Sequence, residues 1–109
     1  MKRVFICSPL RGDFEANQHR ARGYARLAAL SGHIPIVPHI YFTQFLEEHT
    51  EEERALGIQM GISLLDICDE LWVFGSSISV GMGMEISHWH KHHAHKTPVR
   101  NFTGEEVEC

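Results

Sequence analysis

Residues 71–85 read Leu-Trp-Val-Phe-Gly-Ser-Ser-Ile-Ser-Val-Gly-Met-Gly-Met-Glu, and this stretch decides the fold. Leu71 to Phe74 is wholly apolar, which is typical of a central strand that is covered on both faces. The segment from Gly75 to Val80 is rich in Gly and Ser and predicts a loop. A helix is expected from Met84 to about His95. The order strand, loop, helix indicates one part of a parallel βαβ arrangement.

The N-terminal third of the chain repeats this order. Val4 to Cys7 predicts a short buried strand. A helix follows, with Asp13 as its N-cap and Gly32 as the residue that ends it. Ile34 to Val37 predicts a second strand, and the proline inside it favours a position at the sheet edge.

The middle and the end of the chain supply the remaining elements. His39 to His49 predicts a short amphipathic turn or helix. Thr50 to Glu53 has the pattern of a capping box and predicts the start of a longer helix. Pro98 to Phe102 predicts the last strand, and the polar tail 103–109 is expected to fray. We therefore expect one α/β domain over 1–109, a flavodoxin- or Rossmann-like three-layer sandwich with a four- to five-stranded parallel sheet.

Composition limits the class of partner. The 109 residues hold 10 Lys and Arg against 14 Asp and Glu, a net charge of −4. This balance argues against binding a nucleic acid polymer but allows a small anion held by local groups. The chain shows no signal peptide and no apolar run long enough for a membrane span, so we expect a cytoplasmic protein without a membrane partner. Cys7 and Cys68 are predicted to be buried thiols and Cys109 an exposed one.

The most informative candidate site is the segment after the third strand. In parallel sheets, ligands bind beyond the carboxyl ends of the strands. There Gly81 and Gly83 would let the backbone approach a ligand, and Ser79 and the helix amides would favour an anion. Glu85 would face the same crevice as nucleophile, general base or clamp on sugar hydroxyls. The alternative is a tight turn, with the carboxylate stabilising the helix dipole.

Two other segments are expected at the same edge. After the first strand, Arg11 beside Gly12 could pair with a phosphate, and Ser8 could bind a sugar or base. After the second strand, His39 beside Tyr41 could donate to a base or act as an acid. The alternatives are a surface arginine in a capping turn and a packed, hydrogen-bonded histidine.

The tract from His88 to His95 contains five histidines. His88 and His92 are one helical turn apart and could hold a metal. No HExxH pattern occurs, and no carboxylate or cysteine nearby in the sequence completes a ligand set, so a solvated helix face is the favoured interpretation. No Walker A loop or dinucleotide fingerprint occurs either, and we expect neither a metal site nor a cofactor.

Three stretches together resemble a known family: Cys-Ser-Pro-Leu-Arg-Gly, Leu-Leu-Asp-Ile-Cys-Asp-Glu-Leu-Trp-Val-Phe, and Ser-Val-Gly-Met-Gly-Met-Glu. Residues 3–102 resemble the nucleoside 2-deoxyribosyltransferase-like superfamily, and in particular a branch of short bacterial and phage proteins. The superfamily also contains the 2′-deoxynucleoside 5′-phosphate N-hydrolases, whose phosphate-binding serine and Arg-Gly pair correspond to Ser79, Arg11 and Gly12.

The resemblance implies cleavage of a glycosidic bond, with Glu85 attacking C1′ of a small-molecule nucleotide or nucleoside. It also implies a homo-oligomer, a dimer or higher. The family enzymes carry a second carboxylate where this chain has Gly61. The leading hypothesis is therefore a nucleotide-directed N-glycosidase or deoxyribosyltransferase-like enzyme. The alternative is a protein that binds or sequesters a nucleotide or ADP-ribose-type signal without cleaving it.

Overall fold

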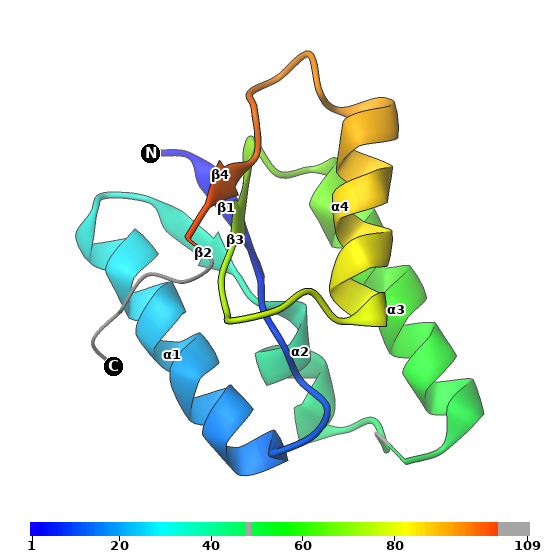
Figure 1. Ribbon diagram of the computed structural model, residues 1–109. Helices are drawn as coiled ribbons and strands as arrows, with labels where there is room; N and C mark the ends of the chain where they lie inside the picture. Colours follow the sequence, from blue (N-terminus) through cyan, green and yellow to red (C-terminus); the bar gives the residue numbers. More distant parts are fainter. Residues whose placement is uncertain (48, 103–109) are drawn as a thin grey trace.

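The computed structural model describes residues 1–47 and 49–102. Its elements alternate between strands and helices (Figure 1). In chain order they are β1 (Arg3–Cys7), α1 (Phe14–Leu30), β2 (Ile34–Ile36), α2 (Pro38–Tyr41), η1 (Phe42–Gln44, a 3-10 turn), α3 (Glu51–Asp66), β3 (Glu70–Val73), α4 (Val80–His92) and β4 (Arg100–Asn101).

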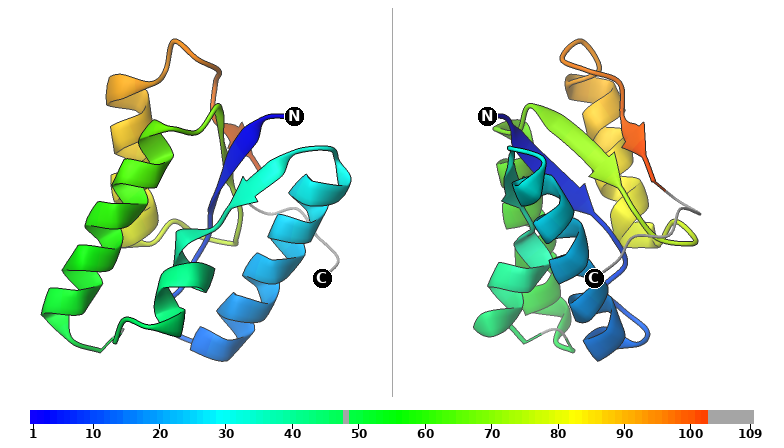
Figure 2. Two further views of the ribbon diagram at one scale, coloured as in Figure 1. Left: turned by 180° about the vertical axis from the view of Figure 1, so that it is seen from behind. Right: turned by 90° about the vertical axis from the view of Figure 1, so that its left-hand side faces the viewer.

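The four strands form one parallel sheet with the order β2-β1-β3-β4. The strand of Leu71 is internal, as predicted, and the proline-containing β2 lies at the edge. Helix α1 covers one face of the sheet, whereas α3 and α4 cover the other (Figure 2). The predicted α/β three-layer arrangement is therefore confirmed, with four strands in the part of the chain that the structure describes.

Side chains of the two internal strands alternate between the two faces, because successive residues of a strand point in opposite directions. Phe5, Leu71 and Val73 pack with Trp89 under α3 and α4. Ile6, Trp72 and Phe74 face α1 instead. Each internal strand therefore carries an unbroken apolar run, as expected for a sheet with helices on both sides.

The starts of α1, α3 and α4 show how the residues just before a helix determine where it begins. Asp13 caps α1 as predicted, because its Oδ1 accepts from the Ala16 amide at 3.1 Å. At α3, Thr50 precedes the helix but does not cap it: Glu53 accepts from the Thr50 hydroxyl and from the amide of Glu47. Helix α4 begins at Val80 rather than at Met84, which corrects the prediction.

The early start of α4 has a clear cause. Ser79 Oγ accepts from the Met82 amide at 3.2 Å and acts as the N-cap. Gly81 and Gly83 therefore lie inside the first turns of α4 and not in a loop. A serine directly before a helix is a common N-cap, and here it outweighs the low helix propensity of the two glycines.

The remaining boundaries differ by a few residues. Helix α4 ends at His92, before the predicted His95, and β4 is shorter than the predicted strand. The tail 103–109, with Cys109, lies outside the described residues. Cys7 and Cys68 are both buried thiols, as predicted. None of the described helices is both long and apolar enough to cross a lipid bilayer.

The strand order fixes where a ligand would enter. From β1 the chain proceeds to β2 on one side and later to β3 on the other. The crossovers therefore diverge at the carboxyl ends of β1 and β3, which is the place where open parallel sheets bind ligands. Ser8 follows β1 directly at this point, and the loop to α4 follows β3.

Candidate active site

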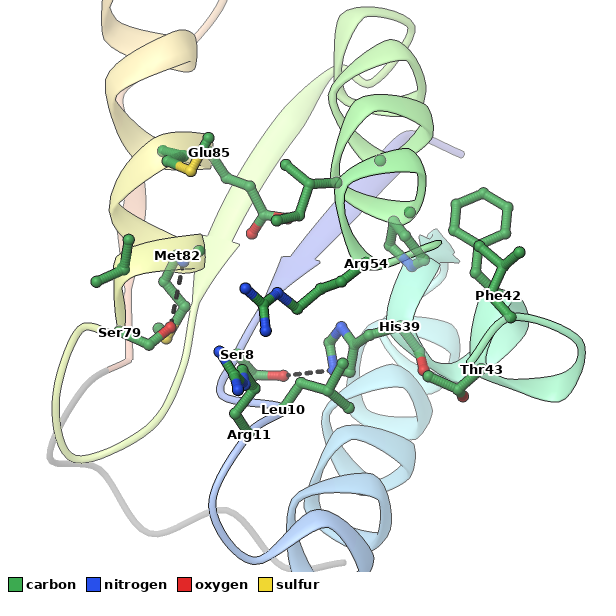
Figure 3. Close-up of a pocket in the computed structure, with 18 of the residues that line it drawn as sticks. Ser8, Leu10, Arg11, His39, Phe42, Thr43, Arg54, Ser79, Met82 and Glu85 are labelled. Carbon is green, nitrogen blue, oxygen red and sulfur yellow. Dashed lines mark hydrogen bonds between the residues drawn. The ribbon is translucent and has the colours of Figure 1, made fainter. Parts of the chain in front are cut away.

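A cavity of about 690 Å³ opens at this end of the sheet (Figure 3). Its walls come from the segment after β1, from α2 and η1, from the first half of α3, and from the start of α4. The predicted site residues among its walls are Ser8, Arg11, Gly12, His39, Ser79, Gly81 and Glu85. The three segments that were expected to meet are thus brought together, in a volume that suits a small organic ligand.

Glu85 reaches into the cavity from α4, toward α3 (Figure 3). Burial raises the pKa of its carboxyl to about 7, and a hydrogen bond from the Cys7 thiol partly opposes this rise. A carboxyl with a pKa near 7 exists in both protonation states at neutral pH. Such a group is suited to nucleophilic or acid–base chemistry, which makes it a candidate catalytic residue.

Cys7, at the end of β1, is hydrogen-bonded to Glu85 and is fully buried. Its Sγ also donates to the carbonyl of Met82 at 3.8 Å. Burial and the nearby carboxyl raise the pKa of the Cys7 thiol far above its ordinary value. The group therefore remains a neutral hydrogen-bond donor rather than a reactive thiolate.

Gly61 faces Glu85 across the cavity. A Cβ added to Gly61 would lie 4.0 Å from Glu85 Oε2 and 3.7 Å from the nearest atom of Pro38. Asp66, on the same helix, does not line the cavity, and its carboxylate binds His88 and His93 instead. The place beside Glu85 on α3 therefore carries no side chain, and a Cβ added there would be in ordinary van der Waals contact with Pro38.

His39 lies opposite Glu85 and is held from several sides. Its Nε2 is 3.1 Å from Ser8 Oγ, while its carbonyl accepts from Gln18 Nε2 and Thr43 Oγ1 (Figure 3). Burial lowers the pKa of the imidazole to about 4, so the ring is neutral at pH 7. A neutral ring can donate or accept one hydrogen bond but is a poor source of a proton at that pH.

The N-terminus of α4 forms another wall. The Met82 amide is bonded to Ser79 Oγ and the Gly83 amide to the Ser79 carbonyl. The amides of Val80 and Gly81 precede the first intrahelical bond, and both residues line the cavity. A Cβ at Gly81 would meet no atom within 4 Å, so the backbone there is open to a ligand.

Arg54 was missed by the sequence analysis. It enters the cavity from α3 and ends between Glu85 and His39 (Figure 3). No short motif marks it, but Arg54, Gly57, Ile58 and Gly61 recur at three- and four-residue spacing and share one helix face. An arginine and two glycines on one helix face are the sequence signal that could have predicted that α3 lines the cavity.

Two predicted residues do not line the cavity. Tyr41 is 64% exposed and packs on Phe42 and Phe45 at the surface. Gly83 lies within α4, where an added Cβ would approach Ile78. The apolar wall comes instead from Phe42, Leu46 and Ile58.

Comparison with known proteins gives a family and a fold. Residues 2–102 match the model of a family described as a domain of unknown function (DUF7768), and the chain belongs to that family. No curated protein matches the chain. One similar solved structure is a 2-deoxyribosyltransferase from the psychrotolerant bacterium Bacillus psychrosaccharolyticus, with a TM-score of 0.68 and 14% identity. The match covers 97% of this chain and 77% of that one, and it shows a shared fold.

Proposed function

We propose that this member of the DUF7768 family cleaves the N-glycosidic bond of a nucleotide, as a hydrolase or a transferase, with Glu85 as the nucleophile. One observation carries the proposal: the Glu85 carboxyl, with its pKa near 7, lies in a cavity of about 690 Å³ whose walls hold two arginines. The likeness in fold to a 2-deoxyribosyltransferase supports the same class of reaction.

The proposed pose follows from the chemistry of the walls. A phosphate would bind the first-turn amides of α4, with Ser79 and Arg11 beside it. The sugar would then lie over Glu85, and the base would pack on the apolar wall of Phe42 and Ile58. Ser8 and the neutral His39 would supply hydrogen bonds to the base or sugar.

The proposed reaction has two steps. The Glu85 carboxylate attacks C1′, and the C1′–N bond breaks with its electron pair leaving on the base, which takes a proton from solvent. Water, or a second base in a transferase, then attacks C1′ and releases the carboxylate. Only ionised Glu85 can begin this sequence, because the neutral carboxyl is a far weaker nucleophile than the carboxylate.

A panel of nucleoside monophosphates tests the proposal, with free base measured by chromatography. We expect the wild type to release base from at least one of them and Glu85→Gln to release none above background. Glu51→Gln, which changes an exposed carboxylate outside the cavity, is the matched control. Equal rates for Glu85→Gln and the wild type would remove Glu85 as the nucleophile.

A second function is favoured by Gly61, which leaves the place beside Glu85 without a carboxylate. In that case the chain binds a nucleotide or an ADP-ribose-type molecule and leaves it intact. A thermal-shift screen against nucleoside mono- and diphosphates, NAD and ADP-ribose separates the two functions. A shift with intact ligand supports binding alone, and free base in the same mixture supports catalysis.

A further inference from the structure

Three side chains that could bind a metal meet outside the cavity. His88 Nε2 lies 2.6 Å and His93 Nε2 2.7 Å from Oδ1 of Asp66. The three potential ligand atoms are all within 4.8 Å of one another. The sequence analysis found no carboxylate near the histidines, because Asp66 comes from α3, 22 positions before His88. The structure also pairs His88 with His93 on this carboxylate, rather than with His92 one turn away.

The two histidine nitrogens and Asp66 Oδ1 could bind a small divalent ion if each nitrogen moved slightly away from the carboxylate oxygen. Zinc binds imidazole nitrogen and carboxylate oxygen at about 2.0–2.2 Å, which places neighbouring ligand atoms of a tetrahedral site about 3.3 Å apart. Each histidine nitrogen would therefore withdraw from Asp66 Oδ1 by about 0.6 Å. The side chains of His88 and His93 are 24% and 13% exposed, so the site is accessible from solvent but its ligands are already partly ordered.

The electrostatics of this end of the molecule favour a cation. Helices α3 and α4 lie side by side and both end here (Figure 1), so the negative ends of two helix dipoles converge on the cluster. Lys96 brings a positive charge close by, but its ammonium binds the carbonyls of Asp66 and Cys68 and not the carboxylate.

We propose that Asp66, His88 and His93 bind one divalent cation of the zinc type, which joins the end of α3 to the end of α4. A solvent molecule would complete the tetrahedron. The site lies at the opposite end of α4 from Ser79 and does not share ligands with the cavity. Its role is to fix the packing of the two helices that carry Arg54 and Glu85, independently of any reaction in the cavity.

Calorimetric titration of the metal-free full chain with ZnCl₂ tests the proposal. We expect one ion per chain, and a dissociation constant that rises by about 100-fold or more in Asp66→Asn and His93→Ala, since even the partners of ligands contribute 10- to 100-fold. His90→Ala is the matched control, because His90 is an exposed histidine of the same helix outside the cluster. It should bind zinc as the wild type does.

A second readout separates a built site from general binding by histidines. Zinc should raise the melting temperature of the wild type and His90→Ala, but not of Asp66→Asn, which keeps the shape of the side chain and can still accept hydrogen bonds. Equal loss of affinity in His90→Ala and His93→Ala would overturn the proposal. Unchanged affinity in Asp66→Asn would overturn it as well.

Discussion

Gly61 is the position at which one substitution tests the geometry of the site most directly. A Cβ there lies 4.0 Å from Glu85 Oε2, and its nearest neighbours in Pro38, at 3.7 and 3.8 Å, are at ordinary contact distance, so the Cβ of Gly61→Asp meets no clash and its carboxyl group can turn into the cavity that Gly61 lines. The new carboxylate would lie about 5 Å from that of Glu85, where two like charges repel by about 3 kcal/mol at an effective dielectric constant of about 20. That energy equals about two pKa units. Because Glu85 has a pKa of about 7 in the wild type, we expect the higher pKa of the pair to be about 9.

The assay is an NMR titration of carboxyl carbons in protein labelled at Glu and Asp. Gly57→Asp is the matched control, because a Cβ at Gly57 faces Leu46 at 3.6 Å and has no contact with Glu85. It adds the same charge to the same face of α3, one turn earlier. An upward shift of the Glu85 pKa in Gly61→Asp that clearly exceeds the shift in Gly57→Asp is expected. Equal shifts in the two variants would refute the placement of Gly61 beside Glu85.

Four further predictions follow from the same site. Burial raises the pKa of Glu85 to about 7, so the folded state holds its proton longer than the unfolded state, and stability is lost as pH rises from about 4.5 to 7. Glu85→Gln should therefore match the wild type below that window and exceed it by about 3 kcal/mol above it, measured by urea unfolding. The assay should compare the free energies of unfolding of the two proteins at each pH. The low pKa of His39 makes the stability of the wild type rise between about pH 4 and pH 6.5, which opposes the effect of Glu85. If Glu85 is the nucleophile, kcat/KM should rise through pH 7, whereas a fall would assign it the role of an acid. Arg11→Met should weaken nucleotide binding by about 10- to 100-fold, the value of a charged hydrogen bond to the phosphate, while Arg22→Met on exposed α1 should not. Light scattering should show a dimer or larger oligomer, and a monomer at micromolar concentration would contradict that prediction.

The fold could be predicted because its signals are local. The apolar run of Leu71 to Phe74 requires cover on both faces, and the proline within β2 requires an edge. The internal position of one strand and the edge position of the other can each be inferred from a few consecutive residues, without knowing which distant residues pack against them. The start of α4 was misplaced for a related reason: the glycines suggested a loop, whereas the Ser79 cap decided the boundary.

The site could be predicted where a residue lies between the carboxyl end of a strand and the first turns of the next helix. Ser8, Ser79 and Glu85 meet this condition, because parallel strands end at one edge of the sheet. Arg54 and the Asp66 cluster do not, since they depend on how α3 packs against its neighbours. Such packing is set by many weak contacts between residues far apart in the sequence, and a short motif does not encode it.

The charge distribution explains how an acidic chain can have a site for anions. The net charge is −4, yet burial raises the pKa of Glu85 to about 7, so its carboxyl is only about half ionised at that pH, and burial keeps His39 neutral. The guanidinium groups of Arg11 and Arg54 also line the cavity. These two cations balance the carboxylates of Glu47 and Glu53, which line the same cavity, so an anionic group meets little net repulsion there. A bound phosphate would in turn hold the pKa of Glu85 high, and a cation that moves toward this carboxyl from the cavity wall, such as Arg54, would favour its ionised, nucleophilic form.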